Sequence, residues 1–330
     1  MKIAVFGDGA WGTALAMNLI ANGHGVTLWG AFPDYLEEMK KSRTNGRFLP
    51  GVTLPETLEF ESDAEQAVRN CDIILLATPT QFLRGVLKKM NGAVAPGRVV
   101  INVAKGIEKD SFLRISEIVR EELGFVTYVA LSGPSHAEEV ARKVPTAVVA
   151  ASASKEAAET VQKLFMNENF RVYTSDDVVG VELGGALKNV MAIAAGIIDG
   201  MELGDNPKAA FMTRAIYEMG KLGELLGGKQ NTFSGLSGVG DLIVTCTSGH
   251  SRNRHVGEEL GRGKTLSEIL DAMGMVVAEG VPTSLGAYTL ARRAGAETPL
   301  IDSIYAILYN DLSAVSALRE LMTRQAKAEV

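Results

Sequence analysis

The feature that most constrains the fold is the glycine-rich segment that opens the chain, MKIAVFGDGAWGTALA. Residues 3–6 form a short apolar run typical of a buried strand, and residues 13–20 have helical character. Between them Gly7, Gly9 and Gly12 follow the spacing G-x-G-x-x-G. A strand, this glycine pattern and a helix together are typical of a turn that binds the pyrophosphate of a dinucleotide.

Each glycine has a physical reason to occupy its position. Gly7 permits the tight turn, Gly9 lets a pyrophosphate approach the backbone, and Gly12 lets the helix pack closely on the strand. The free N–H groups and the dipole at the helix N-terminus favour an anion there. A second apolar run, residues 26–29, follows at the distance of a β-α-β unit. The alternative is a glycine turn that only forms a corner.

Composition and charge limit the kind of protein. A chain of 330 residues with 46% hydrophobic and 22% charged residues predicts two soluble globular domains. A net charge of −6 argues against nucleic acid as the main partner but leaves room for an anionic substrate. We expect no membrane span, because no eighteen apolar residues run uninterrupted. Cys71 and Cys246 are too few for a disulfide framework, which predicts a cytoplasmic protein with inert thiols.

The first half of the chain alternates between strand-like and helix-like segments. Further strands are expected at residues 26–29, 73–77, 99–103, 129–131 and 147–150, and helices at 62–69, 82–90 and 111–122. This alternation predicts an α/β fold with a parallel sheet. Ligands of such sheets bind outside the carboxyl ends of the strands, so the turns that follow the strands are candidate contacts.

The character of the chain changes after Tyr173. Ser175, Asp176 and Asp177 predict the N-cap and acidic first turn of a helix that runs past Lys188. From there the pattern is almost entirely helical. We therefore expect a dinucleotide-binding domain over residues 1–177 and an all-helical substrate and catalytic domain over residues 178–330.

One charged residue stands in the apolar helix GALKNVMAIAAGIIDG at residues 185–200. Lys188 is its only ammonium group, and burial lowers the pKa of a lysine toward working pH. A neutral amine there accepts an alcohol proton while hydride leaves the same carbon, and the ammonium donates in reverse. The alternative is a lysine that extends to the surface. Asn189 remains open as a cap, a packing amide or a substrate contact.

A second unusual segment, GLSGVGDLIVTCTSGHSRNRHVG, covers residues 235–257. Asp241 directly follows the glycines of this segment. It either holds Lys188 or a substrate hydroxyl, or it pairs with an arginine. Ser251 suits a helix N-cap, and the planar guanidinium of Arg252 suits a phosphate at that helix end. No Cys, His and carboxylate residues stand at zinc-ligand spacing, so we expect no metal.

Three further residues follow predicted strands. Lys105 stands after the strand at 99–103, and Gly133 and Ser135 stand after the strand at 129–131. Because the strand ends share one edge of the sheet, these residues are expected to face a ligand, although each also suits the start of a helix.

Together these segments resemble the bacterial-type NAD(P)-dependent glycerol-3-phosphate dehydrogenases. The matching segments occur in order as GDGAWGTALA, FLPG at 48–51, AKGIE, LSGPSHAEEV, ELGGALKNVMAIAAGI, GLSGVGDL, CTSGHSRN and AEGVPTS. They span residues 1 to about 284, and eight motifs in one order make the resemblance specific.

The resemblance implies a Rossmann domain, an all-helical domain and a site between them. It implies reversible reduction of dihydroxyacetone phosphate to sn-glycerol 3-phosphate for phospholipid synthesis, by a homodimer, with Lys188 as proton donor and acceptor. The implied substrate contacts are Lys105, Gly133, Ser135, Asp241, Ser251, Arg252 and Asn253. Besides the glycine turn, the implied dinucleotide contacts are Ala10, Trp11, Lys105, Ala137, Arg252, Val277 and Glu279.

One position departs from this pattern. Members of the family often carry a basic residue or histidine where this chain has Ala31, after the second strand. An acid there is typical of NAD enzymes and a cation of NADP enzymes, but Asp34 lies beyond Pro33. The sequence therefore leaves the choice between NAD and NADP undecided. The remaining alternatives are a related two-domain dehydrogenase of a 3-hydroxy acid or sugar acid, and a dinucleotide sensor without turnover.

Overall fold

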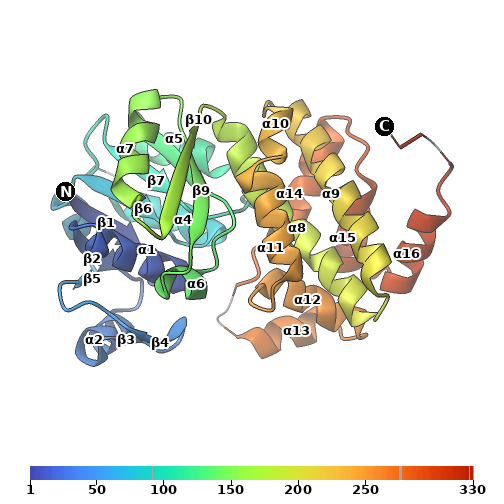
Figure 1. Ribbon diagram of the computed structural model, residues 1–330, viewed down its shortest axis with the longest axis horizontal. Helices are drawn as coiled ribbons and strands as arrows, with labels where there is room; N and C mark the ends of the chain where they lie inside the picture. Colours follow the sequence, from blue (N-terminus) through green and yellow to red (C-terminus); the bar gives the residue numbers. More distant parts are fainter. Residues whose placement is uncertain (91, 275–276, 327, 330) are drawn as a thin grey trace.

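The computed structural model describes residues 1–90, 92–274, 277–326 and 328–329. These residues form two halves that lie side by side, a sheet covered by helices and a bundle made of helices (Figure 1). The N-terminus lies on the sheet half and the C-terminus on the helical half.

The sheet has eight strands in the order β10-β9-β8-β7-β6-β1-β2-β5. All six predicted strands are present. The two strands that the sequence did not reveal, β5 and β10, lie at the two edges, where one side is unpaired and polar residues are tolerated. The strands are β1 (Lys2–Phe6), β2 (Gly25–Trp29), β5 (Glu59–Glu61), β6 (Ile73–Leu76), β7 (Val99–Asn102), β8 (Thr127–Ser132), β9 (Thr146–Ala151) and β10 (Phe170–Ser175).

The sheet is mainly parallel, as expected, but this expectation is wrong at one pair, because β9 runs antiparallel to β8. The helix between them, α6 (Ala137–Ala141), has five residues and is only about 7 Å long. A strand of six residues is about 20 Å long. This short helix does not carry the chain back along the sheet, so β9 starts at the edge where β8 ends.

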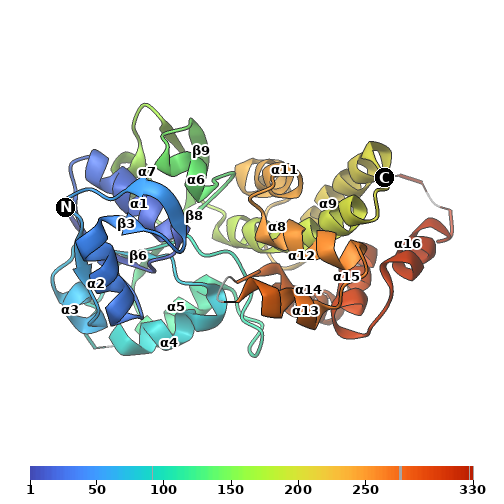
Figure 2. The same cartoon turned by 90° about the horizontal axis from the view of Figure 1, so that it is seen from below.

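Helices cover both faces of the sheet (Figure 2). One face packs on α1 (Ala10–Ala21), α6 and α7 (Lys155–Phe165), and the other on α3 (Ala64–Arg69), α4 (Thr80–Met90) and α5 (Ile115–Leu123). After β2 the chain adds α2 (Pro33–Ser42) and a hairpin of β3 (Thr44–Asn45) and β4 (Leu49–Thr53). Each face thus has its own apolar core.

The helical half is built around α8 (Val178–Gly200), whose N-cap Asp177 accepts a hydrogen bond from the N–H of Gly180, as predicted. By length and composition α8 is able to cross a membrane, but 83% of its most apolar window is buried, as in the core helix of a globular protein. Around it lie α9 (Asp205–Leu225), α10 (Gln230–Phe233), a π-helical turn (Leu236–Gly240), α11 (Asp241–Thr247), α12 (Arg252–Gly261), α13 (Leu266–Met273), α14 (Gly280–Arg293), α15 (Pro299–Tyr309) and α16 (Ala314–Met322).

Two glycines allow α8 and α12 to touch. A Cβ on Gly257 would lie 1.8 Å from the carbonyl oxygen of Ile193, and one on Gly196 would lie 1.9 Å from that of Arg254. Neither contact tolerates a side chain, so the two helix backbones are in contact. This packing fixes the N-terminus of α12 beside the middle of α8.

A buried carboxylate in the bundle predicts a pH effect on stability. Glu218 accepts hydrogen bonds from the N–H groups of Leu300 and Ile301 at 3.0 and 2.8 Å, at the start of α15. Burial raises the pKa of Glu218 to about 7, although these two N–H groups oppose the shift. The carboxyl group of Glu218 therefore binds its proton more tightly in the native state than in the unfolded state. This binding stabilises the native state fully below about pH 4.5, and the stabilisation is lost as pH rises through 7.

Glu218→Gln is expected to flatten this decline in the free energy of unfolding, which urea titrations between pH 5 and 8 measure. Glu224→Gln, at an exposed position on the same helix, serves as the control. Equal pH slopes in wild type and Glu218→Gln would show that this carboxyl group does not titrate between the two states.

Candidate active site

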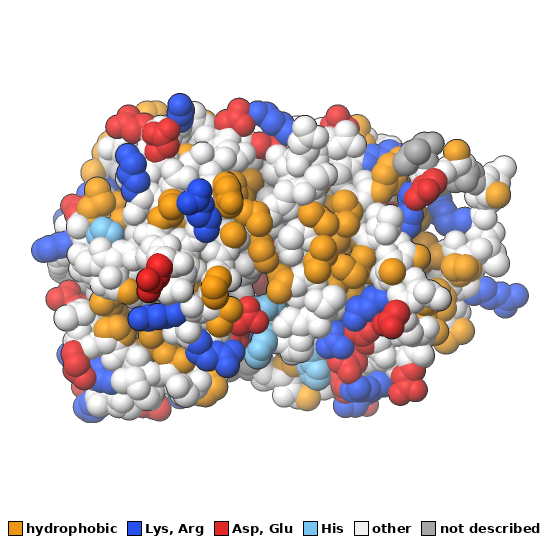
Figure 3. Space-filling model, in the orientation of Figure 1, with side chains coloured by type: hydrophobic (Ala, Val, Ile, Leu, Met, Phe, Trp, Pro, Cys, Tyr) orange, Lys and Arg blue, Asp and Glu red, His pale blue; other side chains and the backbone are white. Residues whose placement is uncertain are grey.

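A hollow of about 230 Å³ lies between the two halves, at the carboxyl ends of β1, β6, β7 and β8. Figure 3 shows histidine side chains at the junction of the halves. His136 and His250 line the hollow, and their rings are 5.7 Å apart. The predicted site residues that line the hollow are Ala10, Trp11, Lys105, Ser135, Ala137, Lys188, Ser251, Arg252, Asn253, Val277 and Glu279. Gly7, Gly9, Gly12, Gly133 and Asp241 are not in its lining.

The glycine turn at one end of the hollow has the shape that the sequence predicts. Gly7 has a φ of 132°, and its N–H donates to the carbonyl of Trp29 at 3.0 Å. A Cβ on Gly12 would lie 2.0 Å from the carbonyl oxygen of Gly7, so only glycine fits between strand and helix. In front of Gly9 there is open space. The indole N–H of Trp11 is buried without an acceptor. This cradle at the N-terminus of α1 fits a pyrophosphate.

The centre of the site is a carboxylate held between two lysines. The Nζ atoms of Lys105 and Lys188 lie 2.5 and 3.0 Å from the two carboxylate oxygens of Asp241. Lys188 also donates to Oγ1 of Thr245 at 2.7 Å, and Lys105 donates to the carbonyl of Gly133 at 3.0 Å. Lys188 is buried, so the alternative of a lysine that extends to the surface is wrong.

Burial and the neighbouring charges shift the pKa values of Lys105 and Asp241. Burial, followed by the charge of Lys188, lowers the pKa of Lys105 to about 8, while Asp241 opposes the shift. Burial by itself would raise the pKa of Asp241, but the two ammonium groups lower it overall. With one carboxylate and two ammonium groups, the centre carries an excess positive charge and attracts an anion.

Thr245 also belongs to this centre, although the sequence pattern did not indicate it. It lies four residues after Asp241, on the same face of α11. That spacing was visible in the sequence, but nothing there showed that this face meets Lys188.

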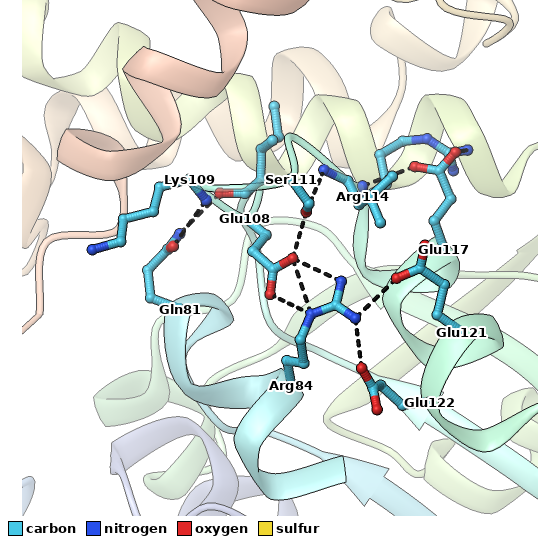
Figure 4. A network of polar contacts seen from close by, with 11 residues as sticks. Gln81, Arg84, Glu108, Lys109, Ser111, Arg114, Glu117, Glu121 and Glu122 are labelled. Atoms are coloured by element: carbon cyan, nitrogen blue, oxygen red, sulfur yellow. Dashed lines mark hydrogen bonds and ion pairs between the residues drawn. The ribbon is translucent and has the colours of Figure 1, made fainter. Parts of the chain in front are cut away.

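The loop that carries Lys105 is held by a network that the sequence also did not reveal. Arg84 of α4 bonds Glu108 of this loop through two nitrogen atoms, at 2.9 and 2.8 Å (Figure 4). Gln81 donates to the carbonyl of Ile107 at 2.8 Å. The guanidinium of Arg84 also forms ion pairs with Glu121 and Glu122 of α5. The loop is therefore fastened to two helices, which fixes Lys105.

A chain of amides links the halves beside the lysines. The side-chain amide of Asn189 donates to the carbonyl of Lys105 at 3.1 Å and accepts from the amide of Asn253 at 2.9 Å. The amide oxygen of Asn253 accepts from the N–H of Gly280 at 2.8 Å. Asn189 is thus a packing amide. The backbone N–H of Asn253 is one of the first N–H groups of α12, which have no partner within the helix.

The N-terminus of α12 faces the hollow. Ser251 caps the helix by accepting from the N–H of Arg254 at 3.2 Å, as predicted. The guanidinium of Arg252 is exposed and donates to the carbonyl of Val277 at 3.3 Å. The first N–H groups of a helix have no partner within the helix, so this end offers them and a guanidinium to an anion.

Glu279 joins the two halves on the other side of the hollow. Its carboxylate accepts from the N–H of Thr80, at the start of α4, at 3.0 Å, while its second oxygen is buried without a donor. Burial raises the pKa of Glu279 to about 7.

The cysteines take no part in the site. Both are free and buried, and burial raises the pKa of Cys246 to about 12, so its thiol is unreactive. Among the residues that the structure describes, no group of three or more His, Cys, Asp or Glu side chains is placed to hold a metal ion.

Comparison with known proteins identifies the family. A family model for the N-terminus of NAD-dependent glycerol-3-phosphate dehydrogenase matches residues 2–158, and one for its C-terminus matches residues 177–319. The NAD(P)+ glycerol-3-phosphate dehydrogenase of Bacillus cytotoxicus is 50% identical over 332 residues, which cover 100% of this chain and 97% of that protein.

Solved structures of glycerol-3-phosphate dehydrogenases superpose on this chain. The glycerol-3-phosphate dehydrogenase of Coxiella burnetii superposes with a TM-score of 0.94 at 39% identity, over 98% of this chain and 99% of that one. The Saccharomyces cerevisiae enzyme superposes with a TM-score of 0.83 at 28% identity, over 98% and 99% of the two chains. The resemblance in the sequence and the α/β sheet domain followed by an all-helical domain are confirmed. The chain belongs to the NAD-dependent glycerol-3-phosphate dehydrogenase family.

Proposed function

We propose that the protein catalyses the reversible, NAD(P)H-dependent reduction of dihydroxyacetone phosphate to sn-glycerol 3-phosphate. The observation that carries this proposal is the Lys105–Asp241–Lys188 centre, which lies between a dinucleotide cradle and the N-terminus of α12. The relatives with the same fold are named for this activity and for NAD(P)+.

The residues around the hollow fit a dinucleotide. Gly7, Gly9 and Gly12 would receive its pyrophosphate. Ala10, Trp11, Lys105, Ala137, Arg252, Val277 and Glu279 would contact the rest, and all of these line the hollow. When bound in reduced form, the cofactor supplies a hydride from its nicotinamide C4 to the substrate carbonyl carbon.

We infer that Lys188 moves the proton. Its Nζ ammonium donates to the carbonyl oxygen as the carbonyl carbon receives hydride, which leaves a neutral amine and a secondary alcohol. In the oxidative direction the same amine accepts the hydroxyl proton. Asp241 and Thr245 hold Nζ in place, and the second ammonium, Lys105, stabilises negative charge on the oxygen. Because the centre is buried, these charges act with little screening by water.

The phosphate of the substrate is proposed to bind at the start of α12. Arg252 offers a guanidinium, and the backbone N–H groups of Arg252 and Asn253 lie at the positive end of the helix dipole. Ser251, Gly133 and Ser135 complete the proposed substrate contacts.

Arg252→Ala is expected to raise the KM for dihydroxyacetone phosphate about 10- to 100-fold, because it removes a charge-assisted hydrogen bond worth about 1.5–3 kcal/mol. Steady-state kinetics at saturating NADH measure this change. Arg262→Ala, directly after the other end of α12, is the control. An unchanged KM in Arg252→Ala would place the phosphate elsewhere.

The decisive test of the function is the loss of NADH or NADPH absorbance on addition of dihydroxyacetone phosphate, with unphosphorylated dihydroxyacetone as control. Oxidation that requires the phosphate is the expected result. Absence of oxidation with either cofactor, in protein shown to bind NADH, would contradict the proposal.

We further propose that residues 1–177 and 178–330 are the two domains, and that the protein is a cytoplasmic homodimer that supplies phospholipid synthesis. The resemblance of the sequence supports these points. Light scattering after size exclusion tests the dimer, and a monomeric mass would contradict it.

A further inference from the structure

Residues 30–33, which directly follow β2, include no acid or cation, although a dinucleotide-binding sheet usually distinguishes NAD from NADP there. That place is the end of the second strand, where an acid receives the ribose 2′-hydroxyl or a cation receives the 2′-phosphate. Here β2 ends at Trp29 and is followed by Gly30 and Ala31. Asp34 already lies in the first turn of α2 and is exposed.

The carboxylate of Asp8, in the turn that follows β1, lies at this place. Phe6 of β1 pairs with Trp29 of β2, and the next residue, Gly7, donates to the carbonyl of Trp29. Asp8 therefore lies beside Gly30. A Cβ on Gly30 would be 2.6 Å from Oδ2 of Asp8, so the carboxylate fills the space that a side chain at the end of β2 would take.

One oxygen of the Asp8 carboxylate has no hydrogen-bond donor. Oδ2 is buried and accepts no hydrogen bond, whereas buried carboxylate oxygens in proteins are normally bonded. Burial raises the pKa of Asp8, although its own N–H and the charge of Arg47 oppose the shift. A ligand hydroxyl would supply the missing donor.

The backbone beneath this carboxylate is fixed. The carbonyl of Asp8 accepts from the side-chain amide of Asn45 at 2.8 Å. That amide is buried and also donates to Oγ1 of Thr13 at 2.8 Å, and its oxygen accepts from the hydroxyl of Tyr35 at 2.7 Å. The hairpin after α2 thus holds Asp8 from behind, which is the preorganisation that a recognition group needs.

We propose that Asp8 receives a hydroxyl of the adenosine ribose and thereby makes the protein prefer NAD to NADP. A 2′-hydroxyl donates a hydrogen bond to a carboxylate. A 2′-phosphate replaces that hydroxyl and brings a charge of about −1.5 to −2 against the carboxylate. The proposal rests on dinucleotide binding at the glycine turn, and it adds the residue that selects between the two cofactors.

Arg47 is the competing group in this region. Its guanidinium carbon lies 4.2 Å from the centre of the Tyr35 ring, and its positive charge acts to lower the pKa of Asp8. It is exposed, so water and salt screen its attraction for a phosphate, whereas Asp8 is partly buried beside the glycine turn. We therefore assign the selection between NAD and NADP to Asp8. Selection by Arg47 is the competing explanation that the test below distinguishes.

The test measures the binding of NADH and NADPH to the full chain without substrate, by titration calorimetry. Loss of a hydrogen bond to a charged group predicts that Asp8→Asn weakens NADH at least about tenfold. The same variant is expected to bind NADPH as tightly as wild type or more tightly, so the ratio of the two Kd values shifts at least tenfold toward NADPH. Adenosine diphosphate and adenosine 2′,5′-bisphosphate, which lack the nicotinamide, are expected to shift in the same way.

Matched variants make the result specific. Asp34→Asn, which removes an exposed acid of the same segment, is expected to change neither Kd. Asp8→Ala removes the unbonded oxygen and is expected to fold and to show the same shift in ratio. An unchanged ratio in both Asp8 variants, or a ratio that moves only in Arg47→Ala, would overturn the proposal. Failure of the proposed reaction is distinguishable, because wild type would then bind NADH without oxidising it.

Discussion

Lys188→Ala is expected to lower kcat at least about a hundredfold, the lower range for loss of proton-transfer catalysis. The variant loses the ammonium that lies 3.0 Å from Asp241 and 2.7 Å from Thr245, and within the described residues the hollow then keeps Lys105 as its remaining lysine. Binding of NADH is expected to persist, because the glycine turn is untouched. Single-turnover oxidation of NADH with saturating dihydroxyacetone phosphate measures the chemical step.

Two control variants separate proton transfer from charge and from folding. Lys188→Arg keeps the positive charge but does not release a proton, so it is expected to stay at least about tenfold below wild type. Lys208→Ala removes a lysine that pairs with Asp199 outside the hollow and is expected to turn over normally. Turnover of Lys188→Ala at the wild-type rate would remove Lys188 from the mechanism.

Asp241→Asn is expected to reduce both activity and stability. Asp241 is buried, and its carboxylate is the shared counter-ion of Lys188, which is also buried, and of Lys105, which is partly buried. Breaking a buried ion pair typically costs about 3–5 kcal/mol of folding free energy, because a charge is left without a partner. Urea unfolding at pH 7 measures the loss, and kcat is expected to fall because Nζ of Lys188 loses one of the two groups that hold it.

The loss in stability should depend on pH with a defined sign. Without the carboxylate the pKa of Lys105 falls further below its value of about 8, so the lysine loses its charge as pH rises. The cost of Asp241→Asn is therefore expected to be smaller at pH 9 than at pH 7. Asp199→Asn is the matched control, since Asp199 also holds two cations but is partly exposed, and its cost should be less than half. An equal loss in the free energy of unfolding for the two variants would contradict the role of Asp241 as the shared counter-ion of Lys105 and Lys188.

Local patterns in the sequence determined much of this protein. The buried run before Gly7, the glycine spacing and the helix after it depend on neighbouring residues, and the structure has all three. The cap at Asp177 and the cap at Ser251 are also local, because a capping side chain bonds an N–H three residues away. The edge strands β5 and β10 escaped notice because they are not continuous apolar runs.

Only the tertiary structure decided which residues meet. Lys105 and Asp241 are 136 positions apart, and Arg84 and Glu108 are 24 apart on different elements. The reversal of β9 came from the shortness of α6, and the placing of Asp8 beside Gly30 came from the register of β1 with β2. Helical and strand periodicity arises from forces between near neighbours, so it is readable along the chain. Contacts between distant residues depend on how whole elements pack, and the sequence pattern carries no direct record of that packing.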